Sequence, residues 1–226
     1  MESLFLSIRL ALWVSAILFI IGTPLAYWLA QSQWRGKFLI EAIVALPLVL
    51  PPTVLGFYML VAMGPRGPLG ELWRALFGHA LAFTFTGLVI ASILYSLPFA
   101  VQPLVASFES VDRKLLDASA VLGAGKLRTF LRVILPLSLP GVLTALVLSF
   151  AHTLGEFGVV LMVGGNLPGV TRTASIEIYD QVQSLDYGGA NRLAFVLLIV
   201  SFVVLSIVYG MNRRFGGRMW SPWAVK

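Results

Sequence analysis

Five long apolar segments, none with a charged residue, constrain this chain more than any other feature. They cover residues 10–30, 42–64, 80–108, 133–151 and 193–211. A helix needs about 20 apolar residues to cross the hydrocarbon of a bilayer, and the segments are of that length. Only 12% of all residues are charged, and the mean hydropathy is +0.91. The sequence therefore predicts an all-α membrane protein with five transmembrane helices.

A sixth apolar run, over 157–171, is short and interrupted. It contains five residues that disfavour a continuous helix: Gly158, Gly164, Gly165, Pro168 and Gly169. Irregular backbone at membrane depth is tolerated only where protein buries it or where it lines a cavity. We therefore expect a broken half-helix or a re-entrant segment here. Seven prolines lie in the second, third and fourth apolar segments, which favours a packed bundle around a cavity over a set of plain anchors.

The distribution of positive charge predicts the orientation. Eleven of the 16 lysines and arginines fall in 35–37, 113–132 and 213–226. Because lysine and arginine accumulate on the cytoplasmic side, the N-terminus is expected outside and the C-terminus in the cytoplasm. The pI of 10.0 reflects these short loops and not one basic soluble face, so we expect contact with membrane lipid and no nucleic-acid partner. One membrane domain over 1–226, with a cytoplasmic loop over 109–132, describes the chain.

The cytoplasmic loop is predicted to form two short amphipathic helices. Ser110 is expected to cap the first helix, whose first turn carries Asp112. Gly123 suits a left-handed helix stop, and a second helix is expected to start near Lys126 and to run into the fourth segment. Taken alone, this pattern fits a surface helix that rests on lipid equally well.

The spacing within the loop resembles that of permease subunits of prokaryotic ABC importers. Those carry Glu-Ala-Ala, then a glycine, then Ile-x-Leu-Pro. Here Asp117, Ala118 and Ser119 fill the triplet, Gly123 the glycine, and Val133, Leu135 and Pro136 the end. The resemblance implies that the loop, including Leu122 and Ala124, docks into a groove on a separate ATPase subunit. It also implies the type I permease fold.

The chain has no phosphate-binding loop of its own. The stretch from Gly123 to Lys126 has Leu127 where a serine or threonine must hold magnesium, and Ala120 where the first glycine is needed. We therefore expect no cofactor on this chain, with ATP and magnesium bound by the partner subunit. Cysteine is absent, which excludes a disulfide framework and a thiolate metal site, and no metal site is predicted.

Three further stretches, over 46–54, 154–158 and 169–173, resemble molybdate permeases, and with the loop the resemblance covers nearly the whole chain. Sulfate and tungstate permeases share much of this pattern and are the alternatives. The resemblance implies a homodimer, two ATP-binding cassette subunits, and a periplasmic or extracellular oxyanion-binding protein. It places the chain in the inner membrane of a prokaryote.

The path of a substrate through the five segments would meet no lysine or arginine. Hydroxyl, amide and carboxyl side chains are the candidates: Thr53, Tyr58, Ser92, Tyr95, Ser96, Gln102, Ser149 and Glu156. A neutral path fits a dianion that must be released, because a fixed cation would hold it too tightly. It fits a neutral substrate equally well.

Glu156 is the one acidic residue beside an apolar core, and it follows His152 by four residues. An ionisable group near membrane depth is a candidate functional residue. The alternative is structural, as a His–Glu pair on one helix face or as a cap of the half-helix. An intramembrane enzyme is disfavoured, because His79 and His152 lie in different regions and neither His-Glu-x-x-His nor Gly-x-Ser-x-Gly occurs. No catalytic residue is therefore assigned.

Overall fold

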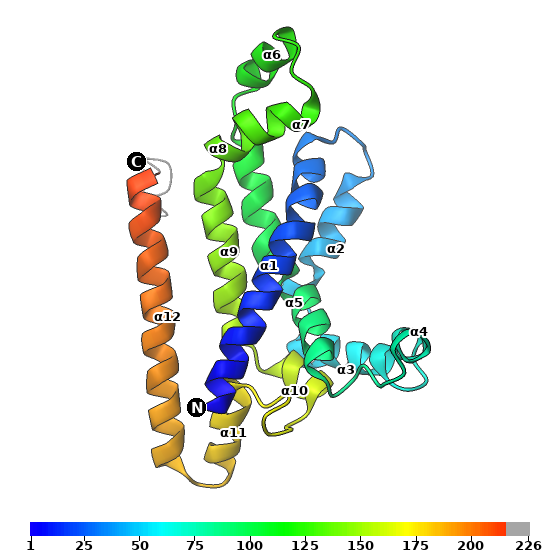
Figure 1. Ribbon diagram of the computed structural model, residues 1–226, viewed down its shortest axis with the longest axis vertical. Coiled ribbons are helices and arrows are strands. Elements are labelled where there is room, and N and C mark those ends of the chain that lie inside the picture. Colours follow the sequence, from blue (N-terminus) through cyan, green and yellow to red (C-terminus); the bar gives the residue numbers. More distant parts are fainter. Residues whose placement is uncertain (216–226) are drawn as a thin grey trace.

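The centre of the molecule is a bundle of three long helices, α1 (Glu2–Gln31), α5 (Phe85–Glu109) and α9 (Leu139–Leu154). They pack against one another in a computed structural model that describes residues 1–215, without the side chains of 208 and 211–215 (Figure 1). All regular elements in the described part are helices. The predicted all-α architecture is confirmed.

One face of α1 is buried at helical spacing, and this explains how it packs. The buried positions include Leu10, Val14 and Leu18, while Leu12, Trp13 and Ile20 on other faces stay exposed. Residues three and four apart share a helix face, so the buried set forms one stripe. This stripe joins two apolar clusters, one toward each end of the bundle. The exposed apolar side chains are those expected of a helix that faces lipid.

Three helices, Glu2–Gln31, Phe85–Glu109 and Tyr187–Ile207, are long and apolar enough to cross a membrane. Two bent helix pairs bring the number to five if each pair is one span, in agreement with the predicted five. In the first pair, α2 (Lys37–Val49) and α3 (Pro52–Met63) meet at 111°. Leu50 has extended dihedral angles there, because the ring of a following proline disfavours the helical conformation.

The second bent pair joins the loop to the bundle. Here α7 (Lys126–Thr129), a π-helical turn η1 (Phe130–Ile134) and α8 (Leu135–Leu137) run continuously before the chain bends by 76° into α9. The second amphipathic helix therefore begins at Lys126, as the sequence predicts. π-helical turns within α-helices are rare and are frequent at functional sites.

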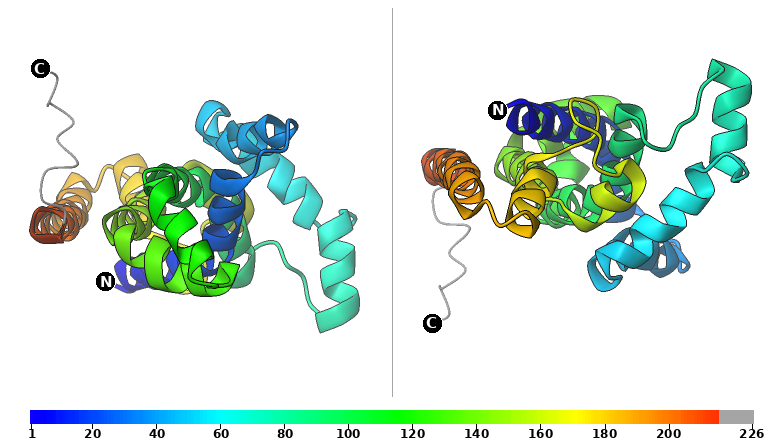
Figure 2. Two further views of the ribbon diagram at one scale, coloured as in Figure 1. Left: turned by 90° about the horizontal axis from the view of Figure 1, so that it is seen from above. Right: turned by 90° about the horizontal axis from the view of Figure 1, so that it is seen from below.

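The predicted half-helix is also confirmed. Helix α10 (Gly158–Gly164) has only seven residues and ends at Gly165, whose φ is +64°. It packs against α3 so closely that a Cβ atom at Gly56 would lie 2.8 Å from the Cβ of Met162. Helix α4 (Pro68–Phe77) projects away from the bundle (Figure 2).

The two ends of the bundle differ in what they carry (Figure 1). The N-terminus lies at one end with α11 (Ala174–Gln183), and we name this the α11 end. The opposite end carries α6 (Arg113–Val121), α7 and the last turns of α12 (Tyr187–Phe215), and we name this the α6 end. The tail cations Arg218 and Lys226 lie outside the described residues, as do the side chains of Arg213 and Arg214.

Candidate functional site

The cap of helix α6 lies two residues later than the sequence predicts. Asp112 is the capping residue, and its carboxylate accepts a 2.9 Å hydrogen bond from the backbone N–H of Lys114. The predicted cap at Ser110 is wrong, because α5 continues to Glu109 and Ser110 keeps helical dihedral angles at its end. The hydroxyl of Ser110 donates instead to the carbonyl of Ser107, at 2.7 Å.

Gly123 ends α6 in the left-handed conformation that the sequence predicts, with φ at +73°. The N–H of Gly123 donates to the carbonyl of Ala120, and the N–H of Ala124 donates to that of Ser119. This pair of bonds is the Schellman arrangement, which satisfies the last carbonyls of a helix and favours glycine at the turn. The chain thereby reverses direction within three residues, and α7 returns beside α6.

Six of the predicted coupling residues therefore meet on α6 and its turn. Asp117, Ala118, Leu122 and Gly123 are exposed, while Ser119 and Ala124 are partly buried. Leu122 exposes 86% of its surface. The seventh, Pro136, lies on α8, between η1 and α9, and is exposed.

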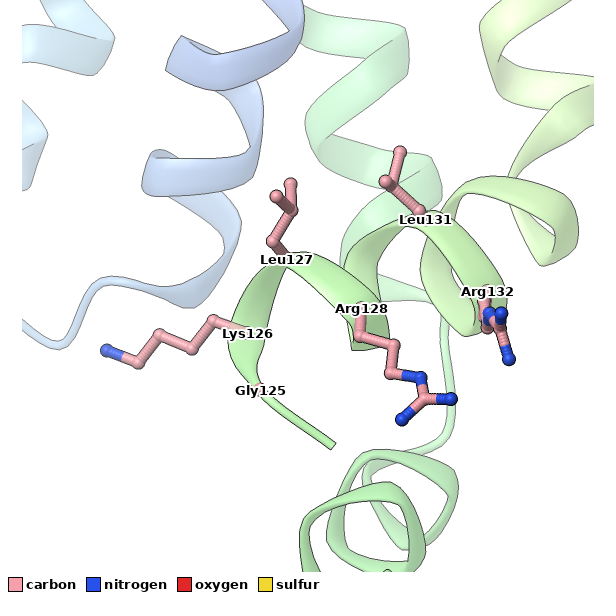
Figure 3. Close-up of a pocket in the computed structure, with 6 residues that line it drawn as sticks. All are labelled: Gly125, Lys126, Leu127, Arg128, Leu131 and Arg132. Atoms are coloured by element: carbon pink, nitrogen blue, oxygen red, sulfur yellow. The ribbon is translucent and has the colours of Figure 1, made fainter. Parts of the chain in front are cut away.

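A shallow open hollow adjoins this turn, lined by Gly125, Lys126, Leu127, Arg128, Leu131 and Arg132 (Figure 3). The two leucines point toward the bundle in this view, Arg128 and Arg132 point away from it, and Lys126 extends to the side. The α6 end presents an apolar tip, the exposed side chain of Leu122, next to a basic surface formed by Lys126, Arg128 and Arg132. Such a combination suits a protein partner with a complementary acidic groove.

A second cluster of polar side chains lies between α5 and α9, within the apolar part of the bundle. The hydroxyl of Ser96 is 2.9 Å from Nδ1 of His152 and 2.9 Å from Oγ1 of Thr153. The imidazole stacks on Phe99, with a ring-centroid distance of 3.9 Å, and lies 4.7 Å from the ring of Tyr95. Two aromatic rings and one hydroxyl therefore hold the imidazole in place.

Glu156 is buried, with 4% of its surface exposed, and neither carboxylate oxygen has a hydrogen-bond partner among the described residues. The expected pair with His152 is absent there, and so is the expected cap, because no side chain caps α10. The reason is that α9 ends at Leu154, so the helical spacing of four residues does not continue to Glu156. Ser92, also without a partner, lies beside this carboxyl.

The other predicted path residues do not share one surface. Thr53 and Tyr58 are exposed on α3, and Gln102 is exposed on α5. Ser149 is buried and donates to the carbonyl of Ala145 in its own helix, at 2.8 Å. Sequence reasoning missed Phe99 and Thr153, because their contacts depend on how α5 and α9, which are distant in the chain, pair with each other.

Comparison with known proteins identifies the family. A family model described as binding-protein-dependent transport system inner membrane component matches residues 22–220. The chain belongs to this family. A curated relative, the molybdenum transport system permease protein ModB of Azotobacter vinelandii, is 51% identical over 208 residues, which are 92% of each chain.

Two further similarities extend the comparison. This chain is 33% identical over 203 residues to the probable sulfate transport system permease protein cysT of Chlorella vulgaris, covering 90% of this chain and 76% of that one. A solved bacterial ABC transporter involved in the import of the polysaccharide alginate matches with a TM-score of 0.74 at 18% identity, over 96% of this chain and 81% of that one. The fold is therefore that of type I ABC importer permeases, as predicted.

Proposed function

We propose that this chain is the permease subunit of an ATP-driven importer that carries molybdate into the cell. The observation that carries the proposal is the 51% identity to a molybdenum permease over 92% of both chains. Sulfate is the second candidate, supported by the 33% identity to a sulfate permease, and tungstate resembles molybdate in charge and shape.

The α6 turn is the proposed docking site for the ATPase subunit. Asp117, Ala118, Ser119, Leu122, Gly123 and Ala124 lie on α6 and its turn, and Pro136 sits where the following helix enters the bundle. The ATPase subunits bind ATP and magnesium, so the permease itself is not an enzyme. Closure of two ATPase subunits on ATP draws the docked turns together and opens the path outward, and hydrolysis reverses this.

The proposed assembly holds two copies of this chain, two ATPase subunits and an external oxyanion-binding protein. The α6 end faces the cytoplasm of a prokaryotic cell, because the loops there carry Arg35, Lys37 and the five cations of 113–132. The N-terminus and α11 then face outward, where the binding protein delivers the anion.

The proposed path is neutral. Thr53 and Tyr58 are exposed on α3, and in this proposal they contact the anion directly. Ser92, Ser96, Ser149 and Glu156, which also belong to the proposed path, are buried between helices. Hydroxyl donors bind a dianion less tightly than a fixed cation does, so they favour release.

Reconstitution tests the proposal. The permease is placed in proteoliposomes with its ATPase and binding protein, and ATP-dependent uptake of labelled molybdate, tungstate and sulfate is compared. We expect uptake of molybdate, with sulfate transported at least tenfold less efficiently. Transport of sulfate alone would show that sulfate, and not molybdate, is the substrate. Transport of none of the three would overturn the proposal.

A further inference from the structure

His152 lies on a strip of α5 and α9 that is partly open. Tyr95 and Phe99 are half-buried on α5 and Gln102 is exposed one turn beyond them, while His152 is half-buried on α9. Residues three and four apart lie on the same face of a helix, so the three α5 residues form one stripe. Nε2 of the imidazole makes no hydrogen bond to any described residue and is not among the buried atoms that lack a partner.

The hydrogen bonds around Ser96 determine which ring nitrogen carries the proton. Thr153 exposes only 2% of its surface, and its hydroxyl has no hydrogen-bond partner other than Ser96 in the part of the chain that the structure describes. If Nδ1 donated to Ser96, one hydroxyl hydrogen would be buried without an acceptor: that of Thr153 if Ser96 donates to Thr153, or that of Ser96 if Thr153 donates to Ser96. Such an orphaned donor costs about 1–3 kcal/mol.

If the two hydroxyls donate in the opposite direction, every hydrogen of this group that lies between Thr153 and His152 has an acceptor. Thr153 donates to Ser96, Ser96 donates to Nδ1 of His152, and the remaining imidazole proton lies on Nε2. The stacking of the ring on Phe99 and its contact with Tyr95 fix the direction of this N–H. The imidazole is then a neutral donor, preorganised before any ligand arrives.

The surroundings indicate what this donor faces. An N–H directed at lipid would have no acceptor, and polar groups at membrane depth face the bundle interior or a water-filled cavity. We infer that the strip faces a water-filled part of the bundle, and the exposed amide of Gln102 on the same strip agrees with this. Neither α9 nor the stretch of α5 from Phe85 to Phe108 contains lysine, arginine, aspartate or glutamate, so the strip offers an anion dipoles and no cation.

We propose that Nε2–H of His152 is an anion-binding donor, which contacts the oxyanion as it passes and is held in the donor tautomer by Ser96 and Thr153. This rests on the proposed oxyanion transport. A neutral N–H binds each successive anion weakly enough to release it. This suits an importer in which the external binding protein supplies the tight binding. Tyr95 and Phe99 act as positioning residues, because they hold the ring without needing to touch the anion.

Uptake kinetics of three variants test the donor. His152→Gln keeps an amide N–H near the position of Nε2, whereas His152→Phe keeps a ring without a donor. Ser96→Ala removes the hydrogen bond to Nδ1, so the proton is no longer confined to Nε2. We expect kcat/KM for molybdate uptake to fall about tenfold in His152→Phe, about threefold in Ser96→Ala, and less than threefold in His152→Gln. ATP hydrolysis stimulated by the loaded binding protein should persist in all three, which shows that they fold and couple.

The matched control is Thr144→Val, because Thr144 lies on the same helix and donates only to the carbonyl of Pro140 in that helix. It should transport normally. Normal uptake by His152→Phe, or equal losses in His152→Gln and His152→Phe, would overturn the proposal. If the unaltered permease transports no oxyanion at all, the proposed function fails instead, and the two failures are thereby distinguished.

A measurement without transport tests the tautomer. Nitrogen NMR of the reconstituted complex, labelled at histidine, separates protonated from unprotonated ring nitrogens, and a His79→Gln variant assigns the signals. We expect the proton on Nε2 of His152, and a mixture of tautomers in Ser96→Ala. A proton on Nδ1 in the unaltered protein would overturn the assignment.

Discussion

The hydroxyls of Ser119 and Thr129 lie 2.8 Å apart and join α6 to α7 across the Gly123 turn. Because of this bond, a displacement of α6 carries α7 with it. Helix α7 continues into η1, where the ring of Phe130 lies 4.9 Å from Tyr27 of α1 and 5.8 Å from Phe108 of α5. A force applied at α6 therefore has a contiguous packed route to two of the three central helices.

Loss of the bond between the two hydroxyls should loosen α6. Replacing Ser119→Ala removes a hydrogen bond worth about 0.5–1.5 kcal/mol, so backbone amides of α6 should exchange with solvent about three- to tenfold faster. Hydrogen exchange with mass spectrometry of the permease measures this directly. Thr129→Ser keeps a hydroxyl and should leave exchange unchanged. Unaltered exchange in Ser119→Ala would show that the bond does not hold the two helices together.

Substitution of Gly123 should impair coupling through backbone strain. A Cβ atom there would meet nothing within 4 Å, so the cost arises from the positive φ of +73°, at about 1–2 kcal/mol for a residue other than glycine. Gly123→Leu should abolish uptake while the protein stays in the membrane, because the side chain also enters the docking surface. Gly123→Asn should retain part of the uptake, since asparagine tolerates this conformation.

The matched control for the turn is Gly125→Ala. Gly125 is equally open, but its φ is −69°, which any residue adopts. ATP-driven uptake in proteoliposomes compares the variants. Equal uptake by Gly123→Leu and the control would show that the Gly123 turn is not needed for coupling to the ATPase.

Features that depend on neighbouring residues were predictable from the sequence. The apolar spans follow from composition, the short α10 from its glycines, and the left-handed stop at Gly123 from the only residue type that adopts it freely. The cap was misplaced by two residues, because serine and aspartate both cap helices and the end of α5 decided between them.

Features that depend on helix pairing were not predictable. Pro51 and Pro52 indicate a break, but the angle of 111° is set by the packing of α3 on α10. Likewise, the spacing of His152 and Glu156 suggested a pair, whereas the partner of His152 proved to be Ser96, on another helix and 56 residues away. One sequence carries no signal for such a contact.

Leu122 should contribute binding energy to the ATPase complex. Its side chain is 86% exposed, and burying a leucine contributes about 1.5–3 kcal/mol. Leu122→Asp should therefore weaken association of the permease with its ATPase at least tenfold, as measured by co-purification and by ATP hydrolysis stimulated by the binding protein. Leu122→Met conserves apolar volume and should bind normally. Wild-type association by Leu122→Asp would mean that this tip stays exposed in the complex.

Gly141 should be intolerant of any side chain, because α5 and α9 approach each other closely there. A Cβ atom there would collide with the side chain of Ser107, and Ser107 and Ser138 exchange 3.3 Å hydrogen bonds, hydroxyl to carbonyl, beside it. Gly141→Ala should thus cost about 1–3 kcal/mol by forcing the helices apart. Thermal unfolding in detergent should show a lowered midpoint. Gly210→Ala is the control, since a Cβ on that helical glycine meets nothing within 4 Å and should leave the midpoint unchanged or slightly raised. Equal midpoints for Gly141→Ala and the unaltered protein would mean that α5 and α9 can separate there without loss of stability.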